Sequence, residues 1–316
     1  MSDRSSIVIG TRGSELALWQ TRWVQHELGK FHPSLRIEVQ IIKTQGDKIL
    51  DAPLSKIGDK GLFTKELERA LLDGRVDLAV HSMKDVPTQV EVGLTIAAVC
   101  EREDVRDVFV SHPKKSYARL ADVPPNGTVA TGSLRRRCQL LRMRPDLTIA
   151  EIRGNLGTRI EKLGNSQWDG MLLAKAGITR LGHSELIAEI LSPIDFLPAV
   201  GQGALAVETR EGDERIRSLV QALNHPPTHR ATLGERALLR RLEGGCQIPI
   251  GAYGRIENGT YRLDALIGSL DGKRSVRSSV EGPPDRSEQL GVALAEKLLA
   301  DGGEAILDEI RQVNAG

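Results

Sequence analysis

A concentrated group of arginines stands between residues 131 and 159. The segment holds seven arginines and two acidic residues, although the formal net charge of the whole chain is only +1. Guanidinium groups bind carboxylates or phosphates through paired hydrogen bonds, so such a segment suits a ligand with several anionic groups. A solvated basic helix face is a second interpretation. Nucleic-acid binding is a third, but the chain has few aromatic side chains on which bases could stack.

Two further residues could take part in chemistry. Asp85 follows Lys84 directly and could shuttle a proton or stabilise a developing cation, or it could simply cap a turn before Val86 and Pro87. Cys246 follows two glycines and could be a nucleophile or a structural thiol. Because it comes after the expected C-terminus of a helix, the helix dipole does not favour its thiolate. Activation would require nearby cations or a reactive electrophile.

The elements that position these residues follow one pattern. Short apolar strands are expected at Ile7–Gly10, Val76–Val80 and Thr128–Ala130, each followed by a polar turn at which a helix begins. Ser14 is the expected N-cap of the first helix. This pattern is typical of α/β units with a mostly parallel sheet, in which ligands bind beyond the carboxyl ends of the strands. The sequence therefore predicts an anion-lined cleft.

Helical phase separates the neighbouring arginines at the start of the third helix. Successive helical residues point about 100° apart, so Arg135, Arg136 and Arg137 cannot all face one cleft. We expect Arg137 to point to solvent, and Arg12 and Lys84 to complete a cationic wall.

Two segments indicate that the chain crosses between two α/β domains. They are Glu101–Asp107 and Pro193–Pro198, which together could form a hinge. The C-terminal part is expected to be α+β, with an antiparallel meander whose turns are Asn258-Gly259 and Asp271-Gly272. Helices are expected at 231–242, 287–300 and 304–313. The glycine- and lysine-rich segment Gln45–Gly61 is either a mobile lid or a solvated surface loop.

Bulk properties favour a soluble, cytoplasmic protein. The N-terminus lacks the apolar run of a signal peptide, and no stretch of about eighteen apolar residues is present. Cys100, Cys138 and Cys246 are widely separated, without the spacing of a zinc or redox site, so no metal is expected. The balanced charge creates no global field that would attract nucleic acid or membrane.

Six motifs stand in order along nearly the whole chain. They are Thr11–Ser14, Val80–Pro87, Cys100–Asp104, Arg153–Arg159, Pro198–Gly203 and Glu243–Gly251. Together they resemble the porphobilinogen deaminase family, also called hydroxymethylbilane synthases.

The resemblance implies two α/β domains like type II periplasmic binding proteins, flanking a cleft, and a C-terminal α+β domain with a three-stranded antiparallel sheet. Domain 1 would comprise residues 1–101 and 201–219, domain 2 residues 102–200, and domain 3 residues 220–316. The strand after Gly203 would return to domain 1. A monomer is expected.

The resemblance also implies a site. Asp85 would be the catalytic carboxylate, and Cys246 would carry a dipyrromethane cofactor through a thioether. The other expected cofactor contacts are Ser82, Lys84, Thr131, Ser133, Arg135 and Arg136. The expected contacts to carboxylates of the substrate or the growing chain are Arg12, Ser14, Arg153 and Arg159. Gly132 departs from the family, which usually has serine there, so one hydroxyl contact would be missing.

The implied reaction joins four porphobilinogen molecules head to tail into hydroxymethylbilane. Each step loses ammonia to give an azafulvenium ion, which the terminal pyrrole attacks, while Asp85 stabilises the cation and manages protons. The alternatives are a solute-binding protein of similar two-domain architecture that performs no chemistry, and a nucleic-acid binder that uses the arginine segment. A receptor would have no need of a covalent pyrrole on Cys246.

Overall fold

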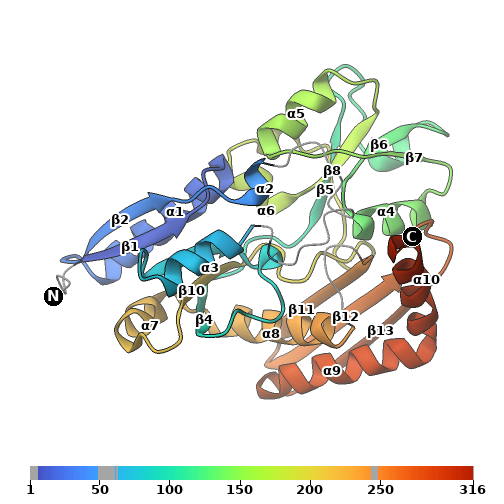
Figure 1. The fold of residues 1–316 in the computed structure, drawn as a ribbon. Coiled ribbons are helices and arrows are strands. Elements are labelled where there is room, and N and C mark those ends of the chain that lie inside the picture. Colours follow the sequence, from blue (N-terminus) through green and yellow to red (C-terminus); the bar gives the residue numbers. More distant parts are fainter. Residues whose placement is uncertain (1–5, 49–60, 62, 243–247, 316) are drawn as a thin grey trace. The chain divides into compact units, whose positions relative to one another are not determined.

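The computed structural model describes residues 6–48, 61, 63–242 and 248–315 (Figure 1). The described residues form two compact units. The first unit holds those within 1–50, 59–103 and 203–229, and the second holds those within 104–202 and 230–316. The chain thus leaves the first unit after Glu103 and re-enters it at Gly203.

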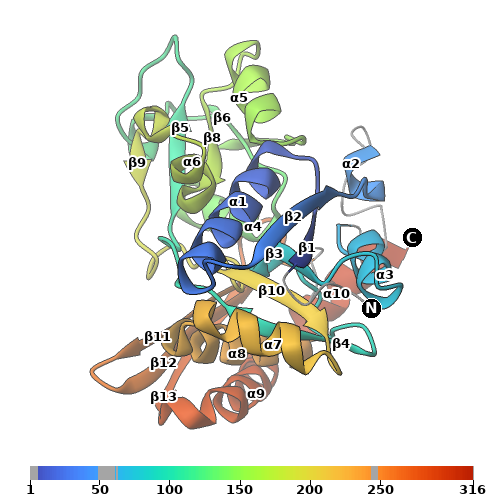
Figure 2. The ribbon, with the colours of Figure 1, turned by 90° about the vertical axis from the view of Figure 1, so that its left-hand side faces the viewer.

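A five-stranded sheet forms the centre of the first unit. Its order is β2-β1-β3-β10-β4, with β1 parallel to β2 and β3, and β10 antiparallel to β3 and β4. In Figure 2 the edge strand β2 runs beside β1, with β3 and β10 beyond. The strands are β1 (Ser6–Thr11), β2 (Arg36–Ile41), β3 (Leu78–Ser82), β4 (Leu94–Val99) and β10 (Leu205–Arg210).

Helices cover both faces of this sheet because apolar side chains alternate along its buried strands. Ile7 and Ile9 of β1 share a core with Leu28 of α1, whereas Val8 packs on the opposite face against the core of Leu67 in α3. The helical elements of this unit are α1 (Glu15–Phe31), α2 (Gln45–Lys48), α3 (Lys65–Leu72), η2 (Met83–Asp85), α7 (Glu214–Val220) and η5 (Gln221–Leu223).

The second unit repeats this topology in a sheet of order β7-β6-β8-β5-β9. Here β5 is the antiparallel strand, next to β8 and β9. In both sheets the antiparallel strand is the one that the chain forms first after it passes between the units. The strands are β5 (Asp107–Ser111), β6 (Thr128–Ala130), β7 (Thr148–Ala150), β8 (Gly170–Ala174) and β9 (Glu189–Ile190).

The helices of this sheet also lie on both of its faces. Phe109 of β5 packs in one core with Leu140 of α4, and its neighbour Val108 packs in the other with Leu163 of α5. The helical elements are η3 (Leu120–Asp122), α4 (Leu134–Met143), α5 (Leu156–Gly164), α6 (Lys175–Arg180) and η4 (Ser184–Leu186).

A three-stranded antiparallel sheet, in the order β11-β12-β13, completes the second unit. The β11–β12 turn has positive φ at both Asn258 and Gly259, the geometry that an Asn-Gly hairpin provides. Leu266 of this sheet packs with Cys138 of α4, which joins the two sheets of the unit. The elements are α8 (Pro226–Arg241), whose residues up to His229 belong to the first unit, β11 (Ile250–Glu257), β12 (Thr260–Gly268), β13 (Ser275–Gly282), η6 (Pro284–Arg286), α9 (Ser287–Leu298), η7 (Leu299–Gly303) and α10 (Glu304–Ala315).

The predicted fold class is confirmed, because two α/β sheets and a three-stranded antiparallel sheet with helices are present. One local expectation was wrong. After β3 the polar turn leads only to the short η2, and not to a helix, because Pro87 disfavours helical backbone at Val86 and offers no amide hydrogen. The chain continues instead to β4.

The second passage between the units also differs from its expected place. It falls at Gln202–Gly203, whereas Pro193–Pro198 lies wholly within the second unit. The division into three domains with the boundaries given above stays a prediction. Of the segment Gln45–Gly61, only α2 and Gly61 lie among the described residues. No helix of the described chain is long and apolar enough to span a membrane.

Candidate functional site

A hollow in the first unit lies at the carboxyl ends of β1 and β3. These are the strand ends at which the sequence predicted a binding site, next to the N-terminus of α1. Its lining combines a cation, hydroxyl groups, an aromatic ring and a carboxylate. The lining residues are Arg12, Ser14, Leu16, Ala17, Gln20, Phe63, Thr64, Val80, His81, Ser82 and Asp85.

Hydrogen bonds fix the wall that α1 contributes to this hollow. Ser14 is the N-cap of α1, as predicted, and its hydroxyl accepts a hydrogen bond from the Ala17 amide at 3.3 Å. Gln20, one turn further on and buried, donates from Nε2 to Oγ of Ser82 at 2.8 Å. This bond ties α1 to the end of β3, so the Ser82 hydroxyl has a defined position.

Arg12 enters the hollow with its guanidinium over the ring of Phe63, 4.1 Å from the ring centroid. Such a cation–π contact holds the charged group in place. Phe63 was not among the residues predicted from the sequence. The sequence feature that could have indicated it is an aromatic residue directly after the Gln45–Gly61 segment, in a chain with few aromatic residues.

Asp85 and Lys84 lie on η2, immediately after β3, and both are exposed. Among the described residues, no hydrogen bond or ion pair of the Asp85 carboxylate is found. A helix-capping or turn-capping aspartate would bond to a nearby amide, so this position favours a carboxylate that is open to a ligand.

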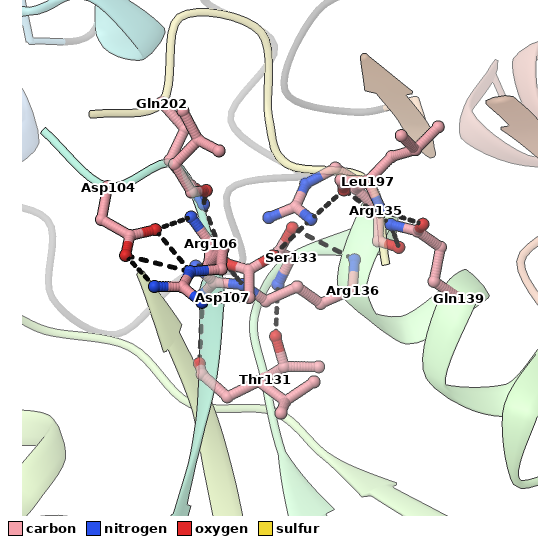
Figure 3. A network of polar contacts seen from close by, with 12 residues as sticks. Asp104, Arg106, Asp107, Thr131, Ser133, Arg135, Arg136, Gln139, Leu197 and Gln202 are labelled. Atoms are coloured by element: carbon pink, nitrogen blue, oxygen red, sulfur yellow. Dashed lines mark hydrogen bonds and ion pairs between the residues drawn. The ribbon is translucent and has the colours of Figure 1, made fainter. Parts of the chain in front are cut away.

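A second polar cluster lies in the other unit, at the N-terminal end of α4 (Figure 3). Asp107, at the start of β5, is fully buried and accepts hydrogen bonds from two arginines. Arg135 donates from Nη1 to Oδ2 at 2.6 Å, and Arg136 donates from Nε and Nη2 to Oδ1 at 3.1 and 2.8 Å. Gln202 adds a hydrogen bond from Nε2 to Oδ1 at 3.0 Å.

The electrostatics of this cluster are those of one carboxylate between two cations. Burial by itself raises the pKa of Asp107, but the charges and hydrogen bonds of Arg135 and Arg136 outweigh it and lower the pKa to about 2. Burial lowers the pKa of Arg135 in spite of Asp107. One carboxylate therefore does not fully compensate two buried guanidinium groups, and the cluster keeps a net positive charge.

The two arginines differ in what remains of their hydrogen-bonding capacity. All three nitrogens of the Arg136 guanidinium donate within the protein, the third to the Leu172 carbonyl at 3.1 Å. Arg135 donates from Nη1 also to the Leu197 carbonyl at 2.7 Å, but its Nε is buried and has no partner among the described residues. Arg137 is exposed, which confirms the phase argument.

Thr131 and Ser133 lie just before α4. The Ser133 hydroxyl caps this helix by accepting from the Arg136 amide at 3.5 Å, and the Ser133 amide donates to Oγ1 of Thr131 at 3.2 Å. Gly132 lies between them. A Cβ at Gly132 would lie 2.6 Å from the Ile152 carbonyl oxygen, which is too close without a backbone shift.

Arg153 and Arg159 flank the N-terminus of α5 in the same unit. Burial lowers the pKa of Arg153, and its Nη1 is buried without a partner in the described part of the chain. Arg159 donates from Nε to the Gly154 carbonyl at 2.8 Å. Burying a guanidinium nitrogen without a hydrogen-bond acceptor costs free energy, and a bound anion would supply that acceptor to Arg153.

The described site residues divide between the two units: Arg12, Ser14, Ser82, Lys84 and Asp85 belong to the first, and Thr131, Ser133, Arg135, Arg136, Arg153 and Arg159 to the second. Cys246 lies outside the described residues. Asp107 was not among the predicted site residues, although an acidic residue directly before the apolar segment Val108–Val110 indicates a buried ion pair. The remaining cysteines, Cys100 and Cys138, are buried, and burial raises the pKa of Cys138 to about 11, so its thiol is unreactive.

Comparisons with known proteins give a consistent result. Residues 7–218 match the family model "Porphobilinogen deaminase, dipyromethane cofactor binding domain", and residues 230–300 match "Porphobilinogen deaminase, C-terminal domain". A porphobilinogen deaminase of Chlorobium chlorochromatii is 52% identical over 313 residues, 98% of this chain and 99% of that protein. One of Geobacter sulfurreducens is 51% identical over 305 residues, 96% and 94% of the two chains. Among solved structures, the periplasmic VFT2 domain of Bordetella pertussis BvgS aligns with a TM-score of 0.43 at 17% identity, over 71% of this chain and 88% of that one.

Proposed function

Because the chain belongs to the porphobilinogen deaminase family, we propose that it joins four porphobilinogen molecules head to tail into hydroxymethylbilane and releases ammonia at each step. It is then a transferase of tetrapyrrole biosynthesis. The observation that carries this proposal is the Asp85 carboxylate, which has no partner among the described residues and shares a hollow with Arg12, Ser14 and Ser82.

A dipyrromethane cofactor fits the donors of the second unit. Each of its rings carries an acetate and a propionate, so the group needs several cationic or hydrogen-bonding partners. Arg135 Nε and Arg153 Nη1 are buried donors without partners in the described chain, and the Asp107 cluster keeps a net positive charge. When bound, the cofactor supplies the free pyrrole α-carbon on which the chain grows.

We assign the roles of the side chains from these positions and from the family motifs. Arg12, held over Phe63, and Ser14 would bind substrate carboxylates at the N-terminus of α1, where the helix dipole favours anions. Arg153 and Arg159 would bind carboxylates of the growing chain. The residues that would contact the cofactor are Ser82, Lys84, Thr131, Ser133, Arg135 and Arg136, and Cys246 would be its point of covalent attachment.

Asp85 would act on the reacting atoms. Loss of ammonia from the aminomethyl group leaves a positive charge on the substrate pyrrole, and a carboxylate beside the pyrrole nitrogen stabilises that charge as it develops. The same carboxylate can accept and return a proton during bond formation. We further propose that the protein works as a cytoplasmic monomer without nucleic-acid or membrane partners.

The intact mass of the purified protein tests cofactor attachment. We expect an excess mass equal to two linked pyrrole units, and we expect Cys246→Ser to lose both this excess and turnover. Cys100→Ser and Cys138→Ser are the matched controls, because both thiols are buried. A Cys246→Ser protein that is fully active and unmodified would remove this cysteine from the proposal.

Asp85→Asn tests the catalytic carboxylate. The change preserves size and hydrogen bonding but removes the charge, so extension should fall by roughly a hundredfold or more. The assay is single-turnover extension followed by mass spectrometry, on protein whose cofactor content has been measured. An extension rate close to that of the parent would make Asp85 a structural turn residue.

A further inference from the structure

A buried histidine–carboxylate pair lies beside the hollow of the first unit. His81 is on β3, directly before Ser82, and Glu208 is on the neighbouring antiparallel strand β10. Nε2 of His81 lies 3.0 Å from Oε2 of Glu208, and the two side chains are 4% and 1% exposed. Charged or chargeable groups are seldom buried this deeply without a reason, since desolvation is costly.

The pair is connected to the site and is not isolated in the core. His81 itself lines the hollow that contains Asp85, Ser82 and Arg12. Its Nε2 is engaged with Glu208, while no partner of its Nδ1 is found in the described chain. The arrangement matches the carboxylate–imidazole pairs in which one ring nitrogen is oriented by an acid and the other is left for proton transfer.

The surroundings of the pair are acidic on the side away from the hollow. Glu68 of α3 is buried, and its pKa is raised mainly by this burial. The negative charges of Glu208 and Glu91 raise the pKa of Glu68 further, whereas a hydrogen bond from Thr64 and the charge of His81 lower it. The charged groups that face His81 are therefore Glu208 from β10, Glu68 from α3, and Arg12 and Asp85 across the hollow. Oε1 of Glu208 is buried and has no partner in the described chain.

We propose that His81, oriented by Glu208, is a second proton-transfer group of this hollow, which accepts the proton lost by the attacking pyrrole α-carbon and returns it to the next leaving amine. This assignment rests on the proposed function and adds a residue to it. Asp85 then acts by stabilising the positive charge, and the proton moves through His81 rather than through the Asp85 carboxylate.

The proton balance closes over one addition. The C–N bond of the aminomethyl group breaks with its electron pair on nitrogen, which takes a proton from the His81 imidazolium and leaves as ammonia. The C–C bond then forms from the electron pair of the pyrrole α-carbon, and the hydrogen on that carbon departs as a proton to neutral His81. One proton is given and one is recovered, so no further reagent is required.

Two variants separate this role from mere packing. His81→Gln removes the imidazole that gives and takes the proton, so single-turnover extension should fall roughly tenfold or more, and the pH dependence that this group gives to the rate should be lost. Glu208→Gln keeps a hydrogen-bond acceptor but removes the charge that favours the imidazolium ion. Extension should then be slower than in the parent protein, and its pH profile should change, because no carboxylate orients the imidazole or favours its protonated form.

His112→Gln is the control for the loss of a buried histidine. His112 is also buried but lies in the other unit, so this change should alter stability without altering the pH profile. If either single variant fails to fold, the double variant His81→Gln with Glu208→Gln leaves no unpaired buried charge and takes its place. Its rate should show the same loss.

The extension rates and pH profiles of the His81 and Glu208 variants test the assignment. Parental rates and a parental pH profile, at equal cofactor content, would overturn the assignment, as would a slower rate whose pH profile is unchanged. Failure of the proposed function would look different, because the parent protein itself would then not extend with porphobilinogen. Asp85→Asn serves as the inactive reference in every series.

Discussion

Asp107→Asn should destabilise the second unit strongly. The substitution keeps the shape of the side chain but leaves the buried cations Arg135 and Arg136 without a counter-charge. Removing one partner of a buried ion pair typically costs about 3–5 kcal/mol. The lowered pKa of Asp107, about 2 against an ordinary 3.8, accounts for about 2 kcal/mol of this by linkage. The remainder reflects hydrogen bonds that an amide cannot replace.

The pH dependence of the parent protein follows from the same pKa. Because the pKa of Asp107 is lower in the folded state, its contribution to the free energy of unfolding is complete above the ordinary value of 3.8. It is lost as the pH falls towards about 2. The Asp107→Asn protein should lack this part of the acid sensitivity.

Tryptophan fluorescence during urea unfolding can isolate the unit concerned. The chain has three tryptophans, and after Trp19→Phe and Trp23→Phe only Trp168, in the second unit, reports. Asp308→Asn is the matched control, since its exposed pair with Arg311 in the same unit should contribute little. A loss below about 1 kcal/mol in Asp107→Asn would refute the argument that this carboxylate compensates the two arginines.

Two further predictions concern the turn and first residues of α4. Arg135→Leu should lower the dipyrromethane content measured by intact mass, because Arg135 has a buried donor without a partner in the described chain. Arg137→Leu should leave this content unchanged, because Arg137 is exposed. Equal losses of dipyrromethane in the two variants would contradict the assignment of Arg135 to the cofactor. Gly132→Ala should reduce the free energy of unfolding by about 1–3 kcal/mol, since the new Cβ meets the Ile152 carbonyl. Gly157→Ala is the control in the same urea titration, because the only atom near its new Cβ is Oδ1 of Asn155 at 3.8 Å. A free energy of unfolding equal to that of the parent in Gly132→Ala would show that the backbone shifts without an energetic cost.

Local physical chemistry was enough to predict much of the framework. Ser14 caps α1 because its hydroxyl reaches an amide three residues ahead, and Asn258-Gly259 forms a hairpin because both residues tolerate positive φ. The exposure of Arg137 follows from helical geometry alone. Local reasoning was wrong after β3, where the constraint imposed by Pro87 outweighed the expectation of a helix.

The sequence by itself determined which residue types end each strand, and hence that Arg12, Ser82 and Asp85 stand at strand ends. Tertiary structure alone decided their partners. Asp107 and Arg135 are 28 residues apart, and His81 and Glu208 are 127 apart. Such pairs depend on sheet order, in particular on the insertion of β5 and β10 as antiparallel strands. A periodic pattern shows which face of a strand is buried, but not which strand lies beside it, because that choice is made by packing between distant segments.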